Sequence, residues 1–394
     1  MNPGLKLLPD NQLAEIRSRF PHIAKGWIHF NHASTAPLST PVVMAMTEYL
    51  QERSYGKLET YSTDLKRIIE SKDSIRTIIN AESTDRLALC GNTSDALNII
   101  TSGLPWKSGD QVILNNLEFP ANVYPYIPLK KLGVELEVLN CPDGKITADQ
   151  IFSAVTSRTR AIALSAVQFL SGYRADLKSI GEYCRARGIL FLVDGIQAVG
   201  AVHIDVQNMN IDALAAGAQK WQLSPQGSGF LYLTETLQSM INQKYFGWLG
   251  VVEPWDFFNY EQQPAASARR YEGGTLNIPC IYGMNAALKM FVELGMDRIE
   301  QHILSLTRML IEGILSNERI RLLSPIQDEE RAGIVTIQLP TDVDVSKIHE
   351  ALMSHKILIS LREGRIRFSP HFYNTPEEIE TTMETLREIC CPQH

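Results

Sequence analysis

Residues 212–221 read DALAAGAQKW, and residues 222–233 continue as QLSPQGSGFLYL. Small apolar residues run up to Lys220, a turn rich in Gly, Ser and Pro follows, and a second apolar run begins at Gly229. This pattern predicts two buried strands, with a lysine at the end of the first. Because burial disfavours the ammonium form, such a lysine can act as a nucleophile or form a Schiff base. The alternative is a solvated lysine at a strand end, since most lysines are exposed.

The composition is that of an ordinary globular protein, with 394 residues of which 44% are hydrophobic. The net charge of −7 argues against a general nucleic-acid or anionic-membrane surface. No apolar run approaches the roughly 20 residues of a membrane span, and residues 1–20 lack the layout of a secretory signal. The six cysteines show no framework spacing, and neither CxxC nor HExxH is present. We therefore expect a cytoplasmic protein without a metal site.

Short apolar runs alternate with helical stretches over the middle of the chain. The predicted strands are 86–90, 111–115, 136–140, 161–167, 189–194, 212–218 and 229–233. Continuous apolar strands separated by helices are typical of a mostly parallel sheet that is covered on both faces. We therefore predict an α/β fold with a seven-stranded sheet. Because ligands of such sheets bind beyond the carboxyl ends of the strands, each strand end is a candidate site.

The pattern changes near residue 281. Two helical segments joined near Gly295 are followed by shorter strands and helices, with a final helix over about 375–389. This indicates a small α+β unit. The expected organisation is an N-terminal segment (1–30) that packs with the small domain, a large domain (31–280) and a small C-terminal domain (281–394).

Residues 91–98 read GNTSDALN and follow the predicted strand 86–90. A strand, a Gly/Thr/Ser turn and a helix make an anion site, because backbone N–H groups, hydroxyls and the helix dipole converge there. Thr93 and Ser94 are therefore candidate phosphate ligands. Alternatively, Thr93 is an ordinary N-cap with Asp95 in the first helical turn.

Two further strand ends carry side chains of interest. Phe119 follows strand 111–115 and can stack on a flat cofactor, although it can equally be a core aromatic beside a proline turn. Gln168 follows strand 161–167 and offers both a donor and an acceptor, or it hydrogen-bonds the loop backbone.

Asp194 ends an apolar strand, and a buried carboxylate needs a cation or several hydrogen bonds. A metal role lacks companion carboxylates, and a ribose role lacks an upstream GxGxxG turn. Four features together specify one ligand. They are an aspartate that keeps a pyridine nitrogen protonated, a Schiff-base lysine (Lys220), a stacking ring (Phe119) and the phosphate cup. That ligand is pyridoxal 5′-phosphate (PLP), whose pyridinium is an electron sink.

The chain resembles the class V, fold-type I PLP enzymes, the superfamily of aminotransferases and cysteine desulfurases. The resemblance covers nearly the whole chain, from FNHASTAP at 30–37 to RIRFSPHFYNTPEEI at 365–379. Other matching stretches are GNTSDALN, LEFPANVYPY, VDGIQAVG (193–200), GAQKW (217–221) and RRYEGGTLN (269–277). It implies a fold-type I architecture, with the large sheet domain followed by the small C-terminal α+β domain.

The resemblance also implies roles for single positions around the cofactor ring. Lys220 matches the lysine of the internal aldimine and Asp194 the partner of the pyridinium. Gln197 matches the residue that bonds the phenolic oxygen of the cofactor. Phe119 lies where many relatives have a stacking histidine.

Around the phosphate, Thr93 and Ser94 match phosphate ligands, and Gln219 occupies a nearby position that is often histidine. Thr275 resembles a residue that reaches the phosphate from the partner subunit, which implies a homodimer with shared sites.

On the substrate side, Arg367 resembles the arginine that pairs with the α-carboxylate of an amino acid, and Gln168 and Asn31 are expected nearby. Further cations that either meet a substrate carboxylate or form ordinary ion pairs are Arg269, Arg270, Arg362 and Arg365.

One departure bears on the reaction. Cysteine desulfurases carry a nucleophilic cysteine on a loop before the carboxylate-binding arginine, whereas residues 359–367 form a short interval without cysteine. This resembles isopenicillin N epimerase-like and C–S lyase-like members. The expected function is therefore Cα–H cleavage of an amino acid through an external aldimine, followed by transamination, epimerisation or elimination. The alternatives are desulfurase-type mobilisation of sulfur or selenium from cysteine or selenocysteine, and a non-catalytic PLP-binding regulatory protein.

Overall fold

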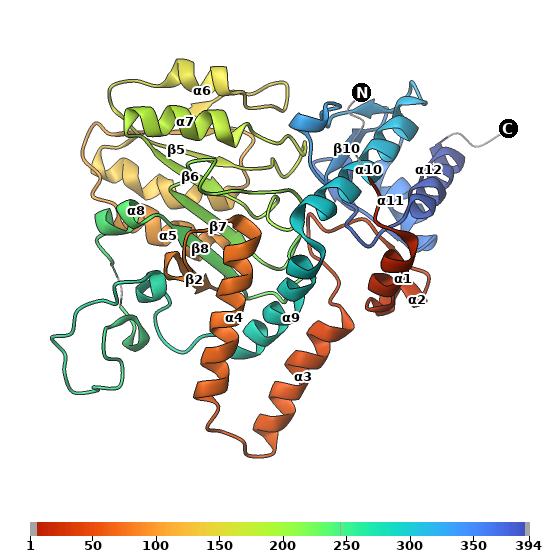
Figure 1. Cartoon of the computed structure of the whole chain (residues 1–394). Helices are drawn as coiled ribbons and strands as arrows, with labels where there is room; N and C mark the ends of the chain where they lie inside the picture. Colours follow the sequence, from red (N-terminus) through yellow and green to blue (C-terminus); the bar gives the residue numbers. More distant parts are fainter. Residues whose placement is uncertain (1–5, 245, 391–394) are drawn as a thin grey trace.

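A seven-stranded sheet is the centre of the larger part of the computed structural model, which describes residues 6–244 and 246–390 (Figure 1). The strands are β2 (Leu87–Cys90), β3 (Gln111–Asn115), β4 (Glu135–Leu139), β5 (Thr159–Ser165), β6 (Leu190–Asp194), β7 (Ala213–Gly217) and β8 (Gly229–Leu233). They are ordered β2-β8-β7-β6-β5-β3-β4. All neighbours are parallel except β8, which is antiparallel to β2 and β7. The predicted mostly parallel seven-stranded sheet is confirmed.

Both faces of the sheet are buried over its central strands, which explains why these strands are continuously apolar, whereas the edge strand β4 is more exposed. In β6, Phe191 and Val193 lie in the core beneath α4 (Tyr61–Ile79) and α7 (Leu177–Arg187). The alternate residues of β6 lie in a second core, beneath α5 (Thr93–Gly103) and α8 (Glu235–Met240). Successive side chains of such a strand contact apolar neighbours on opposite faces, so neither set of side chains is polar.

Further helices surround the sheet and extend away from it. The remaining helices are α1 (Asp10–Ser18), α2 (Pro21–Ala24), α3 (Thr40–Ser54), α6 (Ala148–Ala154), α9 (Ile278–Leu294), α10 (Met296–Leu315), α11 (Val345–Ser354) and α12 (Pro376–Cys390). The helices α3 and α4 project from the body in Figure 1, and both pack against α9. The sequence patterns did not single out α4, whose buried face includes the polar residues Asp64, Ser71 and Lys72.

The C-terminal part forms a smaller, antiparallel unit. Its sheet has the order β12-β13-β10-β9, with strands β9 (Arg321–Leu322), β10 (Val335–Gln338), β12 (Ser360–Arg362) and β13 (Arg365–Phe368). Helices α10, α11 and α12 share one apolar core with this sheet. The N-terminal segment is attached to this unit, because β1 (Ile28–His29) pairs in parallel with β11 (Ile357–Leu358).

Trp221 and a cluster of histidines lie where the two parts meet. The fully buried Trp221 ring faces the rings of His32 and His371, and His29 lies against His32. Gly333, just before β10, leaves space for this indole, since a Cβ there would lie 2.3 Å from the Trp221 ring. The small unit is therefore fitted closely against the residue that follows Lys220.

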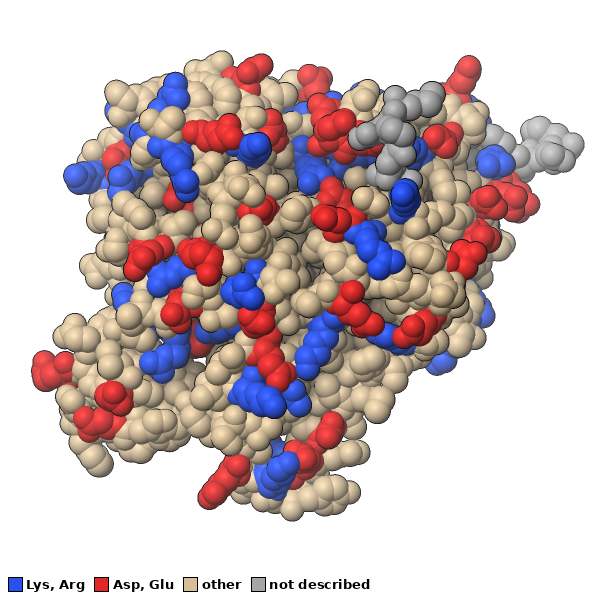
Figure 2. All heavy atoms as spheres, in the orientation of Figure 1, with Lys and Arg blue, Asp and Glu red and all other residues tan. Residues whose placement is uncertain are grey.

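No helix in residues 6–244 and 246–390 is long and apolar enough to cross a membrane. On the face shown in Figure 2, basic and acidic side chains are interspersed.

The buried histidines make stability dependent on pH. Burial lowers the pKa of His29 and His302 to about 4 and of His371 to about 3, and it holds the pKa of His32 well below its usual value. An unfolded chain takes up these protons near pH 6.5. The unfolded state therefore binds more protons as pH falls through about 6.5, and stability declines by up to about 1.4 kcal/mol per pH unit for each group.

We expect the urea midpoint to fall clearly between pH 7.5 and pH 5.5. A His302→Gln variant is expected to be less stable at pH 7.5 but to show a smaller decline, because it has one titrating group fewer. Equal midpoints at the two pH values in the parent protein would contradict this account.

Candidate active site

A cavity of about 390 Å³ lies where strand ends of the large sheet approach the small C-terminal sheet. Such a volume suits a small organic ligand. Most of the predicted site residues line it: Thr93, Ser94, Phe119, Asp194, Gln197, Gln219, Lys220 and Arg367. Ser34 and Arg362 also line it. Segments far apart in the sequence therefore converge on one space, as the topology of a parallel sheet requires.

Lys220 follows β7, which ends at Gly217, so the lysine sits in the turn after the strand rather than at its end. The turn is held by hydrogen bonds from Leu223 N to the Lys220 carbonyl (3.1 Å) and from Ser224 N to Ala218 O (3.1 Å). Burial lowers the pKa of the Lys220 ammonium, Asp194 opposes this shift, and Arg367 and Arg362 reinforce it. The amine is thus shifted toward its neutral, nucleophilic form.

Asp194 is the last residue of β6 and is only 1% exposed. Its Oδ1 accepts a hydrogen bond from Ile196 N (2.9 Å), whereas Oδ2 is buried without a partner in the described residues. Burial is the main cause that raises the pKa of this carboxyl, and the nearby Glu118 raises it further. The hydrogen bond from Ile196 and the charge of Lys220 lower it. A buried carboxylate oxygen of this kind needs a cationic or hydrogen-bonding partner.

The N-terminus of α5 provides the anion cup. Its N-cap is Asn92, whose side chain accepts from Asp95 N (2.9 Å), so the alternative role of Thr93 as the cap does not apply. The Thr93 hydroxyl oxygen accepts from Gly217 N (2.9 Å), which leaves the hydroxyl hydrogen to donate. The backbone N–H groups of Thr93 and Ser94 have no acceptor within the helix, so these two residues can hold a phosphate.

Phe119 is a ring at the cavity wall. The residue is 45% exposed, and the Lys220 Nζ lies 5.7 Å from its ring centroid. It also makes an edge contact with Phe169, at 5.3 Å between centroids. An aromatic face open toward the lysine suits a flat, ring-shaped ligand.

Glu118 was missed in the sequence, although it directly precedes Phe119. This buried carboxylate accepts hydrogen bonds from Asn115 Nδ2 (2.6 Å), Asn122 Nδ2 (2.9 Å) and Ser165, which ties the ends of β3 and β5 together. It also accepts from Gln168 Nε2 (3.0 Å). In the sequence, Glu118 is only an acidic residue shortly after a predicted strand, and no motif distinguishes it from a glutamate on the surface.

Arg367 is the cation at the far wall. It is 2% exposed and donates to Phe169 O (2.6 Å), Ser34 Oγ (2.8 Å) and Ser360 Oγ (3.2 Å). Arg362 donates to the same Ser34 oxygen (3.1 Å). Burial, reinforced by Arg362, lowers the pKa of Arg367 to about 10. Within the described residues neither guanidinium pairs with a carboxylate, so the two are suited to bind one from a ligand.

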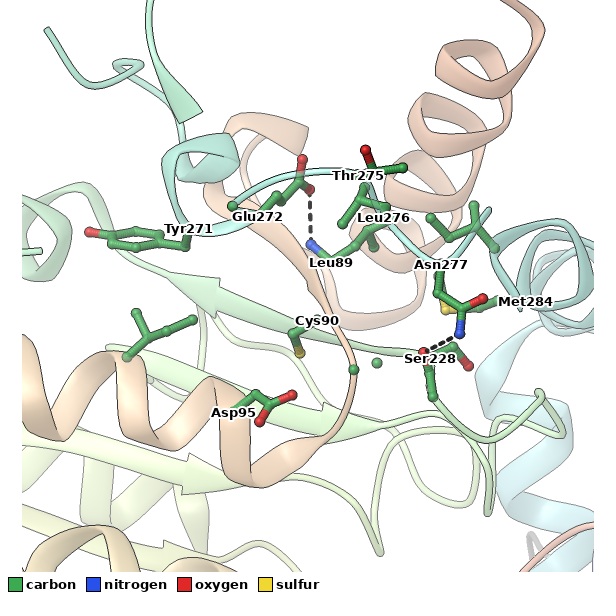
Figure 3. A pocket seen from close by; sticks show the side chains of 16 residues that line it. Leu89, Cys90, Asp95, Ser228, Tyr271, Glu272, Thr275, Leu276, Asn277 and Met284 are labelled. Carbon is green, nitrogen blue, oxygen red and sulfur yellow. Dashed lines mark hydrogen bonds between the residues drawn. The ribbon is translucent and has the colours of Figure 1, made fainter. Parts of the chain in front are cut away.

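Three predicted residues lie outside the cavity lining. Gln168 is bound to Glu118, and Asn31 is bridged to Ser369 of the small unit. Thr275 lines a second cavity of about 290 Å³, shown in Figure 3, on the loop that also carries Glu272. There Glu272 accepts from Leu89 N (2.9 Å), which fixes this loop to the edge strand β2.

The residues of the first cavity fit PLP. The unpartnered Asp194 oxygen suits the protonated ring nitrogen, and the Phe119 face suits stacking on the ring. The α5 cup suits the phosphate, and the desolvated Lys220 suits the aldehyde carbon.

Comparisons with known proteins agree with this assignment. The family model described as Aminotransferase class-V matches residues 28–381. A protein of Methanothermobacter thermautotrophicus named probable cysteine desulfurase is 31% identical over 396 aligned positions, which cover 95% of this chain and 97% of the relative.

Two solved structures of the protein C-DES share the fold. One, a lysine-to-alanine mutant with glycine covalently linked to its PLP cofactor, has a TM-score of 0.85 at 22% identity and covers 96% of this chain and 99% of its own. The other is the cystine C–S lyase C-DES with its product cysteine persulfide, with a TM-score of 0.84 at 22% identity, covering 93% and 98%.

We expect borohydride reduction of the PLP-loaded protein to fix the cofactor on Lys220, because this amine is desolvated and borders the cavity. Peptide mapping by mass spectrometry locates the modification. Lys220→Ala should lose both the adduct and the visible absorbance, whereas Lys178→Ala, on the exposed surface of α7, should keep them. A yellow Lys220→Ala protein whose colour resists excess amine would exclude Lys220 as the anchor.

Proposed function

The chain belongs to the class V aminotransferase family of PLP-dependent enzymes, and from this premise we propose that it cleaves the carbon–sulfur bond of a cysteine-class amino acid. The observation that carries the proposal is the likeness, over 95% of the chain, to a relative named probable cysteine desulfurase. Sulfur chemistry therefore has more support than isopenicillin N epimerase-like chemistry, which rests on the sequence resemblance alone.

We propose that the cofactor is held by the residues that converge on the first cavity. Lys220 would bind it covalently, Asp194 would hold the ring nitrogen, and Phe119 would stack on the ring. Gln197 would donate to the phenolic oxygen, and the phosphate would lie on Thr93 and Ser94, near Gln219. When bound, PLP withdraws electrons from the substrate Cα and so lowers the cost of removing its proton.

The chain's own groups supply binding and proton transfer. Arg367, with Ser34 and Arg362 beside it, would hold the α-carboxylate and so orient the amino acid toward Lys220. Because burial lowers the pKa of Lys220, more of its free amine is neutral near pH 7 and can take the proton from Cα. Expulsion of the sulfur substituent from the β-carbon would follow.

The cysteines of the chain bear on where the sulfur goes. None of the residues that line the first cavity is a cysteine. Cys90 lines the second cavity instead, and burial together with Asp95 raises the pKa of its thiol to about 12, which opposes formation of a nucleophilic thiolate. We therefore propose that sulfur leaves with the departing group and is not transferred to an enzyme cysteine.

The balance of products distinguishes these routes. Elimination from cystine with uptake of water yields pyruvate, ammonia and cysteine persulfide, and elimination from cysteine yields pyruvate, ammonia and sulfide. Transfer of sulfur to a thiol would instead leave alanine and a persulfide on that thiol.

We expect the PLP-loaded protein to form pyruvate and ammonia in equal amounts from L-cystine or L-cysteine, because the cavity lacks a thiol acceptor. Products are identified by mass spectrometry, with selenocysteine and a panel of other amino acids run alongside. Alanine as the main product would contradict the elimination route. Conversion only of amino acids without sulfur would contradict the proposal as a whole.

Arg367→Ala should raise KM for the amino acid by at least about tenfold, because a charge-assisted hydrogen bond contributes about 1.5–3 kcal/mol. Cofactor affinity should change much less. Arg321→Ala, on the distant strand β9 of the same sheet, is the matched control and should keep both values. Equal losses of substrate and cofactor binding would argue against a carboxylate site.

We further propose a homodimer in which Thr275 reaches the cofactor phosphate of the partner, since enzymes of this family are commonly dimeric. Its position on a second cavity, away from its own Lys220 site, is compatible with that arrangement. A cytoplasmic location and a division into 1–30, 31–280 and 281–394 stay predictions from the sequence.

A further inference from the structure

The indole of Trp221 is hydrogen-bonded to a residue of the cofactor cavity. Trp221 Nε1 donates to Gln197 Oε1 (2.8 Å), and Gln197 Nε2 donates to Ala33 O (3.0 Å). Trp221 is 0% exposed and Gln197 is 3% exposed, so water does not compete for either bond. Gln197 lines the same cavity as Asp194 and Lys220.

The two partners of the Gln197 amide define its orientation by their chemistry. An indole N–H can only donate, so it must meet the amide oxygen. A backbone carbonyl can only accept, so Ala33 O must meet the amide nitrogen. An amide turned by 180° would lose both bonds inside a buried site, where each unmet polar group costs about 1–3 kcal/mol. Nε2 still has a second hydrogen for another acceptor.

Trp221 itself has little freedom to move. His371 Nδ1 accepts from Phe372 N (2.8 Å), so its Nε2 carries the proton and donates to Trp221 O (2.8 Å). A Cβ at Gly200 would lie 2.3 Å from the Trp221 carbonyl oxygen, and one at Gly333 would lie 2.3 Å from the ring. The backbone and the indole are therefore both held by close contacts from the two parts of the chain.

We propose that Trp221 is a positioning residue that sets which end of the Gln197 amide serves the cofactor, so that the phenolic oxygen meets an N–H donor. The inference rests on the proposed function, in which Gln197 contacts that oxygen. Trp221 would act only through Gln197, without touching the cofactor or the substrate. Because Trp221 directly follows Lys220, the same turn supplies both the amine that would bind the cofactor and the indole that would orient the Gln197 amide.

A donor at the phenolic oxygen changes a property that can be measured without turnover. The oxygen carries more negative charge once the nitrogen that links Lys220 to the cofactor has lost its proton. An N–H donor therefore stabilises the deprotonated form, and losing it raises the pH midpoint of the visible absorbance. One hydrogen bond corresponds to about one pH unit.

The experiment is a double-mutant cycle in the PLP-loaded protein, read as the pH midpoint of the cofactor absorbance. Gln197→Leu is expected to raise the midpoint by about one unit, and Trp221→Phe to raise it in the same direction. Because Trp221 acts through Gln197, adding Trp221→Phe to Gln197→Leu should shift the midpoint no further. Trp106→Phe is the matched control, since it also removes an indole hydrogen bond, to Thr101 O (2.7 Å), but outside the cavity.

Thermal unfolding of each variant without cofactor separates loss of stability from the predicted shift. If Trp221→Phe does not fold, Trp221→Met is an alternative that also removes the indole N–H. Gln197→Glu keeps Trp221 but places an acceptor oxygen where the amide N–H was, and it should likewise raise the pH midpoint. An unchanged midpoint in a folded Trp221 variant overturns the inference. So does a Trp221 shift that persists in full in the Gln197→Leu background.

The failure of the proposed function gives different results. If Gln197→Leu leaves the midpoint unchanged while Lys220 still carries the cofactor, both the inference and the proposed role of Gln197 are wrong. If the parent protein carries no cofactor on Lys220, the proposed function is wrong and the inference falls with it. A shift in Gln197→Leu without one in Trp221→Phe overturns the inference alone.

Discussion

The site depends on one desolvated carboxylate. Asp194 lies at the end of a strand that is buried on both faces, and one of its oxygens has no partner in the described chain. Such an oxygen is costly unless a cation or a donor meets it, and this is the role proposed for the protonated ring nitrogen of PLP. Burial raises the pKa of Asp194 and lowers the pKa of Lys220, and each of the two groups opposes the shift of the other.

The two parts of the chain meet at this site, and the residues around Lys220 connect them. Ser34 from the N-terminal segment accepts from Arg367 and Arg362 of the small sheet, while Trp221 fills the space left by Gly333. A change in how the small unit packs would therefore alter the positions of Arg367 and Arg362 together with the hydrogen bond from Trp221 to Gln197. Close packing transmits such shifts because an interior with few voids has little room to absorb them.

The family likeness and the local chemistry bear on different steps of the reaction. Membership of the class V family accounts for the cofactor and for an amino-acid substrate. In the proposed reaction, the fate of the sulfur depends on whether a thiol lies close enough to accept it. None of the residues that line the cavity is a cysteine, which is the reason for proposing elimination rather than transfer of sulfur to the enzyme.

By itself the sequence determined the seven apolar strands, their mostly parallel arrangement and the polar residue that follows several of them, because burial on both faces leaves a continuous pattern at short range. Local motifs also led to the prediction of Lys220, Asp194, Phe119, Thr93 and Ser94 as site residues, and all of them line one cavity. Only the tertiary structure decided that Glu118 binds two strand ends together, that Ser34 accepts from two arginines, and that Trp221 donates to Gln197. These are contacts between distant segments, and a hydrogen bond between residues far apart leaves no periodicity in either segment from which to predict it.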